Sequence, residues 1–268
     1  MAHTLSTAVV LALLTSTAVM AEDTNPLIAS PTWEDLRYDV VGDQPIAESS
    51  PLTLDAPYRA HDAATVPVIL HQSDPSVTVT KATVVIDENP APVAAELTFG
   101  AAMQPVEMEL RVRVNQYSNV RVIAETDAGL FMSGRYVKAS GGCSAPASRD
   151  PEQALAGLGQ MKLKMFGETA AQQSTARREA QIMLRHPNYS GLQRNQVTQL
   201  FIPAHFIDHL EVWQGDEMLF TMDGGISISE NPAFRFSYTD NGTAALTVKA
   251  TDTEGNTFEQ VLPKTAEG

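Results

Sequence analysis

Residues 82–99 of the chain read ATVVIDENPAPVAAELTF and combine two β-forming runs with a turn between them. Residues 82–86 cluster β-branched and small apolar side chains, and residues 95–99 alternate apolar with polar ones. The DENP stretch at residues 87–90 separates the runs, because Asn and Asp favour turns and proline cannot donate a ladder hydrogen bond. This pattern predicts a strand, a turn and a second strand.

Runs of the same kind lie on both sides of this segment. They occupy residues 52–54, 66–70, 77–80, 108–114, 119–124 and 130–137. Short strands at such close spacing, separated by turns, are typical of an immunoglobulin-like sandwich. Upstream of them, residues 32–41 carry Trp33, Leu36 and Val40 at helical spacing, which predicts one short helix.

A second set of strand-like runs fills the second half of the chain. They cover residues 160–165, 180–184, 200–203, 207–213, 218–222, 233–238, 245–250 and 258–261. Between the two sets, residues 139–148 read ASGGCSAPAS, which cannot continue a packed strand. We therefore predict an all-β protein of two immunoglobulin-like β-sandwich domains in tandem, residues 22–138 and 161–268. A flexible Gly/Ser/Ala/Pro linker, residues 139–160, is expected to join them.

The first 21 residues, MAHTLSTAVVLALLTSTAVMA, contain no Asp, Glu, Lys or Arg and include an apolar run at residues 8–14. Small residues follow, and Ala21 ends a cleavage site of the signal-peptidase type. A membrane anchor is the alternative, but the run is shorter than the roughly 20 apolar residues that span a bilayer. We therefore expect a cleaved signal peptide at residues 1–21 and a mature chain that is not membrane-bound.

The charge balance excludes two classes of partner. The chain of 268 residues has 18 Lys and Arg against 32 Asp and Glu, a net charge of −14. Nucleic-acid binding draws its non-specific affinity from neutralising phosphates with basic side chains, and anionic lipid surfaces attract the same side chains. We therefore expect no nucleic-acid partner and no docking on anionic lipid.

The chain contains one cysteine, Cys143, which excludes an internal disulfide and a zinc site built on several thiolates. Gly141 and Gly142 precede it and Ser144 follows, so its sequence neighbours offer no apolar face. This predicts an exposed thiol on a flexible arm that suits attachment of a covalent group. The alternative is a buried cysteine acting as a small apolar residue. No base lies beside it in the sequence, which favours a carrier served by partner enzymes over an enzyme.

The histidines give a weak metal signal. His205 and His209 are four residues apart, which is a metal-binding spacing on a helix. The residues around them are strand-like, and on a strand the two rings would lie roughly 13 Å apart. His186 is expected to mark the end of a strand. We therefore expect no metal site, and the chain has no nucleotide-binding or hydrolase motif that would indicate another cofactor.

Several spaced motifs occur in both halves of the chain. The first half contains DAATVPV at 62–68, DENPAPVAA at 87–95, QYSNVRV at 116–122 and VKASGGC at 137–143. The second half contains LRHP at 184–187, FIDHL at 206–210, ISISENP at 226–232 and FRF at 234–236. By these motifs the first half resembles the SoxY sulfur carrier, and the second half resembles its partner SoxZ. The fused order, with WEDL at 33–36 and PYRAHDA at 57–63, looks most like SoxYZ-like carriers associated with quinoprotein dehydrogenases.

The resemblance implies a periplasmic protein that carries sulfur intermediates covalently on Cys143, with Gly141 and Gly142 as a flexible flank. It implies partners among Sox-type cytochromes and hydrolases, or within a quinoprotein dehydrogenase system. In the family the arm ends the chain soon after the cysteine, whereas here Ser144 and a whole second domain follow. The alternative is a non-covalent adaptor for the quinoprotein dehydrogenase and its cytochrome, in which the thiol is incidental.

Overall fold

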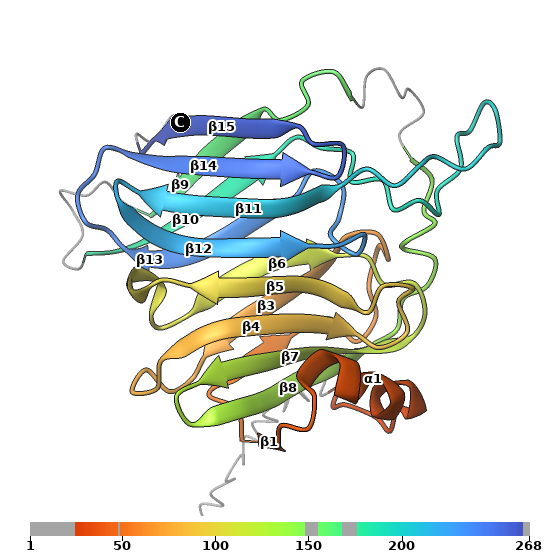
Figure 1. The fold of residues 1–268 in the computed structure, drawn as a ribbon, viewed down its shortest axis with the longest axis horizontal. Helices are drawn as coiled ribbons and strands as arrows, with labels where there is room; N and C mark the ends of the chain where they lie inside the picture. The colour runs from red at the N-terminus through yellow and green to blue at the C-terminus, as the bar shows by residue number, and fades with distance from the viewer. Residues whose placement is uncertain (1–24, 48, 148–154, 168–175, 265–268) are drawn as a thin grey trace, which may run out of the picture.

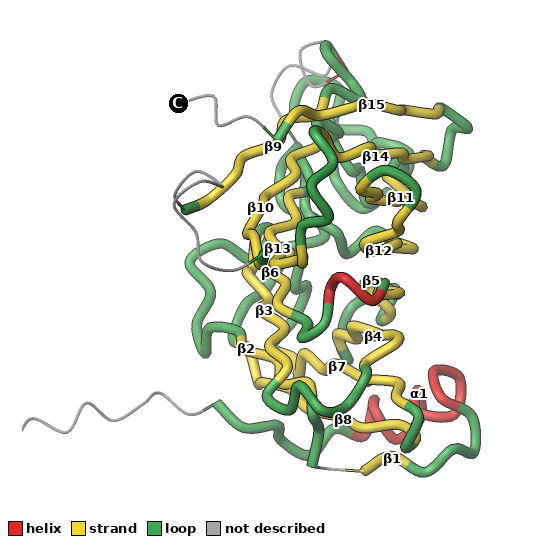
Figure 2. The backbone as a smooth tube through the Cα atoms, turned by 90° about the vertical axis from the view of Figure 1, so that its left-hand side faces the viewer, coloured by secondary structure: helices red, strands yellow, loops and turns green. Residues whose placement is uncertain are grey.

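The computed structural model describes residues 25–47, 49–147, 155–167 and 176–264. These residues form two β-sheets that lie face to face, as the edge-on view in Figure 2 shows. The predicted signal peptide, residues 1–21, lies outside the described residues. Within the described part of the chain, no helix is both long and apolar enough to cross a membrane.

The larger sheet has nine strands in the order β1-β8-β7-β4-β5-β12-β11-β14-β15, seen from bottom to top in Figure 1. Their bounds are β1 Ile46–Ala47, β4 Val79–Ile86, β5 Val93–Phe99, β7 Ser118–Thr126, β8 Gly129–Val137, β11 Ile207–Gln214, β12 Glu217–Gly224, β14 Ala245–Asp252 and β15 Thr257–Pro263. The smaller sheet has six strands in the order β2-β3-β6-β13-β10-β9. Their bounds are β2 Leu52–Asp55, β3 Val66–Gln72, β6 Glu107–Val112, β9 Met161–Phe166, β10 Arg177–Leu184 and β13 Ala233–Thr239.

The prediction of two tandem β-sandwiches is confirmed, and the structure adds that the sandwiches share their sheets. In the larger sheet, β5 of the first half pairs antiparallel with β12 of the second, with Phe99 opposite Phe220. In the smaller sheet, β6 pairs antiparallel with β13, with Met108 opposite Phe236. Backbone hydrogen bonds therefore run without a break from one half into the other.

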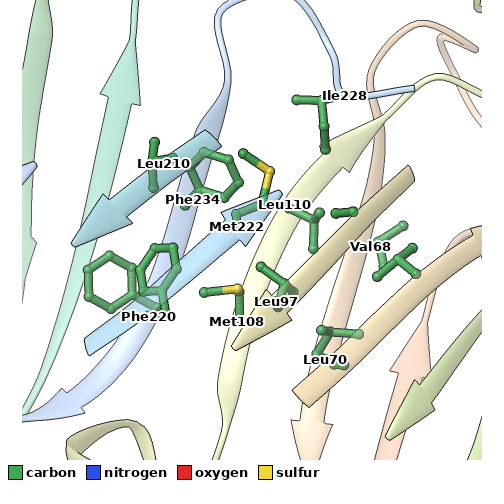
Figure 3. Packing of buried hydrophobic residues seen from close by; sticks show 14 of the residues in the cluster. Val68, Leu70, Leu97, Met108, Leu110, Leu210, Phe220, Met222, Ile228 and Phe234 are labelled. Atoms are coloured by element: carbon green, nitrogen blue, oxygen red, sulfur yellow. The ribbon is translucent and has the colours of Figure 1, made fainter. Parts of the chain in front are cut away.

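The core also continues across this seam. Figure 3 shows Leu97 and Met108 from the first half close to Phe220 and Met222 from the second, and all four are buried. Along β3 the apolar side chains alternate inward as the period of a strand requires, and Val68 is one of those that enter the same core. The two halves consequently bury one common apolar interior.

The predicted helix is α1, Pro31–Val41, and it covers the outer face of the larger sheet over β7 and β8 (Figure 1). The side chain of Ser30 accepts a hydrogen bond from the Trp33 backbone N–H, which caps the helix. Trp33 is buried in a small cluster with Val85 and Ile123, so the strands beneath α1 are apolar on both faces.

One predicted strand is wrong. Residues 200–203 lie in a loop between β10 and β11, where Phe201 makes only an isolated bridge to Arg194. Leu200 and Phe201 are exposed, so the run of apolar residues that suggested a strand has no sheet to pack against. Local β-propensity alone therefore misplaced this element.

Candidate functional site

The cysteine segment, residues 139–147, follows β8 and runs along the right-hand side of Figure 1 from the first half toward the second. The first half holds it through backbone hydrogen bonds. Gly141 N–H donates to Asn115 C=O (2.8 Å) and Gly142 N–H donates to Val114 C=O (3.0 Å). The segment is thus attached to the chain that leaves β6.

The second half holds the same segment from the other side, through the loop at residues 186–196. Its side chains donate to three backbone carbonyls: Ser190 Oγ to Cys143, Gln193 Nε2 to Ala145 (2.9 Å) and Gln196 Nε2 to Ala147 (3.0 Å). The cysteine segment therefore bridges the two halves. Its described part is a docked element, which corrects the prediction of a flexible linker for these residues.

The two glycines before the cysteine serve close packing. A Cβ on Gly142 would lie 2.1 Å from Ala63 O and 2.7 Å from Val114 O, which is closer than atoms can approach. Gly141 has φ of +79°, a left-handed conformation that glycine adopts without steric cost. Both glycines are needed for the fit of the docked segment, and the flexibility of the Gly141–Gly142 flank stays a prediction.

Cys143 is fully buried, with 0% of its surface exposed. This overturns the prediction of an exposed thiol. The small residues around Cys143 in sequence offer no apolar face. Their small size instead lets the segment fit closely between the two halves, at a junction that we call the seam. The residues that contact this part of the backbone are distant in sequence: Arg113 donates to Gly142 C=O and Ser190 donates to Cys143 C=O.

Arg113, the residue after β6, is the charged centre of this seam and is only 1% exposed. Its guanidinium donates to three backbone carbonyls: Nε to Ile228 (3.4 Å), Nη1 to Gly142 (3.4 Å) and Nη2 to Asn188 (3.1 Å). Burial lowers the pKa of Arg113, while the nearby Cys143, Glu230 and Asp62 act in the opposite direction. One side chain of the first half therefore ties together the cysteine segment and two loops of the second half.

The electrostatics of the seam keep the thiol protonated. Burial raises the pKa of Cys143 to about 11, and the positive charge of Arg113 opposes that shift without cancelling it. The thiolate is the nucleophilic form of cysteine. In the docked segment Cys143 is therefore a poor nucleophile at neutral pH.

An open groove of about 670 Å³ lies beside the cysteine segment. Its lining comes from the segment and from the facing loop: Ser144, Pro146, Leu192, Arg194, Gln196 and Gln199. Cys143 itself is not part of the lining, so its neighbours face the groove while the thiol stays covered.

The histidines are arranged differently from their sequence spacing. His209 lies on β11 and contacts the carboxylates of Asp223 (2.6 Å) and Glu211 (3.2 Å). His205 lies before β11 and contacts Asp252, so His205 and His209 do not form a pair. Instead, His205 and His186 meet at Asp252, a cluster of buried residues that spacing in the sequence did not reveal.

Comparison with known proteins accounts for both halves. Residues 37–143 match the family of sulfur oxidation protein SoxY, and residues 166–263 match that of sulphur oxidation protein SoxZ. Among solved structures, the sulfur carrier protein SoxY from Chlorobium limicola f thiosulfatophilum is 29% identical, covering 40% of this chain and 94% of that one, with a TM-score of 0.34. No curated protein sequence matches the chain. The chain therefore belongs to the SoxY and SoxZ families of sulfur-oxidation proteins, as a fused SoxYZ-like protein with both domains in one polypeptide.

Proposed function

We propose that this protein is a periplasmic carrier that holds a sulfur-containing group covalently on Cys143 and presents it to partner redox enzymes. One observation carries the proposal. The only cysteine of the chain is the last residue of the SoxY match, on a segment that lies between the SoxY and SoxZ domains. In this proposal the partners supply the catalysis, whether they are Sox-type cytochromes and hydrolases or a quinoprotein dehydrogenase system.

The carrier needs two positions of the cysteine segment. In the docked position Cys143 is buried and protonated, which suits protection of a bound group but not its transfer. The contacts that hold the segment are mainly hydrogen bonds to backbone carbonyls. Each is worth about 0.5–1.5 kcal/mol net of solvation, and breaking them leaves the strand pairing and the common apolar core intact. Undocking therefore exposes the thiol while both domains stay folded.

Loading is a sulfur-transfer step that needs no separate oxidant. The undocked thiol loses its proton to solvent, and the Cys143 thiolate attacks the outer sulfur of a persulfide donor. A new bond forms between Sγ and that sulfur, the donor's S–S bond breaks, and its electron pair leaves with the donor thiolate. Unloading by a partner thiolate is the same exchange in reverse. A serine hydroxyl cannot take part, because it is scarcely ionised at neutral pH.

The SoxZ domain provides one side of the docking site. Ser190, Gln193 and Gln196 come from it, and all three donate to the cysteine segment. Because a second domain follows Cys143, the segment is tethered at both ends and can only be presented as a loop. A partner site that accepts it is expected to be an open groove, since a deep tunnel requires a free chain end.

Intact-mass analysis of protein taken from the native periplasm tests the covalent load. We expect a fraction of molecules to carry extra mass corresponding to one or more sulfur atoms, removable by a thiol reductant and absent from Cys143→Ser. Peptide mapping locates the adduct on residue 143. Finding only unmodified thiol in protein recovered from cells that oxidise sulfur compounds would reject the carrier.

The burial of Cys143 favours a second candidate, a non-covalent adaptor for a quinoprotein dehydrogenase system. The two functions differ in their need for the thiol. If the protein is a carrier, Cys143→Ser abolishes its contribution to electron transfer in the native host at matched abundance. If it is an adaptor, that variant behaves as wild type while binding to the partner persists.

Gly142→Ala is expected to undock the segment. The new Cβ would meet two backbone oxygens, Ala63 O and Val114 O, and backbone cannot yield as a flexible side chain can. We expect the thiol of Cys143 to react with a probe at least about tenfold faster than in wild type, approaching the rate of an accessible thiol.

A matched control for this variant is Gly255→Ala, in the turn between β14 and β15. Gly255 has a positive φ (+82°), which Gly142 does not, and a Cβ there meets nothing within 4 Å. The control therefore introduces backbone strain without disturbing the cysteine segment, and its thiol reactivity should equal that of wild type. Equal reactivity of Gly142→Ala and Gly255→Ala, with both folded by circular dichroism, would contradict docking through Gly142.

A further inference from the structure

Three buried side chains of the SoxZ domain converge where the loop at residues 186–196, which holds the cysteine segment, begins. His186 follows β10, His205 precedes β11, and Asp252 ends β14. Their exposed fractions are 0%, 6% and 2%. Two imidazoles and a carboxylate, brought together from three parts of the sequence and excluded from solvent, are not explained by the carrier chemistry of Cys143.

The ligand atoms of these residues face one another. His205 Nε2 lies 2.8 Å and His186 Nε2 lies 3.4 Å from the same carboxylate oxygen, Asp252 Oδ2. One ligand atom from each residue lies within 4.8 Å of the other two. Zinc bonds of about 2.0–2.1 Å at tetrahedral angles require ligand atoms about 3.3 Å apart. Small side-chain shifts would therefore centre an ion among the three atoms.

The outer contacts also suit metal ligands. His205 Nδ1 lies 3.8 Å from Glu254 Oε1, which is beyond hydrogen-bond distance, whereas His186 Nδ1 lies 2.7 Å from Asn188 Oδ1. Metal-binding histidines commonly donate their second ring N–H to such an oxygen, which leaves the other nitrogen free for the metal. Asp252 Oδ1 accepts the backbone N–H groups of Glu254 and Asn256, both at 3.0 Å, which fixes the orientation of the carboxylate.

We propose that His186, His205 and Asp252 bind one Zn²⁺ ion. Imidazole and carboxylate are zinc ligands, and the three residues leave the fourth tetrahedral position to a water molecule. Without an ion, the same residues form a hydrogen-bonded cluster in which each Nε2–H donates to Asp252 and the Asn188 backbone N–H (3.0 Å) donates to His186 Nδ1. That ion-free cluster is the outcome that would overturn the proposal.

The site is connected to the docked cysteine. Tyr189 and His205 exchange two backbone hydrogen bonds of 2.7 and 3.0 Å. An ion bound by His186 and His205 would therefore restrict the motion of the backbone around Tyr189. Asn188 O in that stretch accepts from Arg113, and Ser190 donates to Cys143. We therefore expect zinc to tighten the docking of the cysteine segment.

The binding test uses the complete mature chain carrying Cys143→Ser, so that the thiol cannot act as a ligand. After removal of metals with a chelator, calorimetric titration with Zn²⁺ is expected to give one equivalent bound more tightly than micromolar, with a raised melting temperature. Titration with Co²⁺ is expected to give the visible absorption of a tetrahedral complex with nitrogen and oxygen ligands. No stoichiometric binding and no Co²⁺ spectrum would overturn the proposal without any further variant.

The residue assignment is tested by His205→Gln and, in case that variant does not fold, by His186→Gln. Either is expected to weaken Zn²⁺ binding at least about tenfold. His209→Gln is the matched control, because His209 also contacts two carboxylates but is more exposed and lies outside the cluster. Loss of binding in His209→Gln, with retention in His205→Gln, would place the ion at the surface instead.

A second readout uses wild-type Cys143. Adding Zn²⁺ to the metal-free protein is expected to slow the reaction of the thiol with a neutral probe, whereas the same addition to His205→Gln changes little. An unchanged wild-type rate would separate the metal site from the cysteine segment. The sulfur adduct on Cys143 is measured independently of zinc, so failure of the metal site and failure of the carrier are distinguishable.

Discussion

The thiol of Cys143 is expected to react with a thiol-specific probe at neutral pH at least about a hundredfold more slowly in the folded protein than in the unfolded chain. Two effects combine. The pKa of Cys143 is raised from 9.0 to about 11, so the reactive thiolate is about a hundredfold rarer than in an ordinary cysteine. The side chain is also fully buried, which denies access to the probe. Stopped-flow measurement of the reaction with and without urea gives both rates.

The same shift predicts how stability depends on pH. The folded protein retains the Cys143 proton at a pH where the unfolded chain has lost it. The contribution of the neutral thiol is therefore complete below about pH 9 and is lost as the pH rises toward 11. Between these values the stability of wild type should fall more steeply than that of Cys143→Ser. Parallel curves, or a folded-state reaction rate equal to the unfolded one, would mean that the segment is not docked in solution.

Asp87→Ala is expected to lower the free energy of unfolding by about 3–5 kcal/mol, because it removes one partner of a buried ion pair. The Arg121 guanidinium donates to both oxygens of Asp87, Nε at 2.8 Å and Nη2 at 2.9 Å, and Asn119 Nδ2 adds a third hydrogen bond at 3.1 Å. Without the carboxylate, the charge of Arg121 stays buried beneath Trp33, whose ring centroid is 4.6 Å from the guanidinium carbon. Urea unfolding followed by Trp fluorescence measures the loss.

The control for this variant is Asp55→Ala, which removes a second Asp–Arg contact of the same length. Asp55 and Arg135 lie 2.8 Å apart, but their side chains are 60% and 34% exposed. Exposed pairs contribute about 0–1 kcal/mol, so this variant should be nearly as stable as wild type. Similar losses for Asp55→Ala and Asp87→Ala would show that burial does not set the value of the Asp87 pair.

Much of the architecture could be predicted because it depends on local patterns. Alternating apolar residues in β3 and in β13 identify strands with one buried face, and the spacing of Trp33, Leu36 and Val40 identifies α1. The family resemblance also follows from motifs that are contiguous in sequence. The DENP turn was predicted, but the pairing of Asp87 with Arg121 was not, because it joins different strands across the sheet.

The candidate site could be predicted only in part. The sequence is enough to single out Cys143, since it is the only thiol and it stands among small residues. The same surroundings led to the wrong prediction that it is exposed. Exposure depends on what packs against a residue. Ser190 donates to the Cys143 carbonyl and Arg113 to that of Gly142, and both donors are distant from the cysteine in sequence.

The meeting of His186, His205 and Asp252 was likewise not predicted, because each lies at an end of a different strand. The amino-acid sequence by itself determines the all-β class, the order of the SoxY and SoxZ domains and the presence of a single thiol. Each of these depends on a local sequence pattern or on a residue count. The shared sheets, the burial of the thiol and the histidine–aspartate cluster are decided by strand pairing between the two halves and by packing within the SoxZ domain. These contacts join residues that are far apart along the chain, and no local pattern specifies which of them will meet.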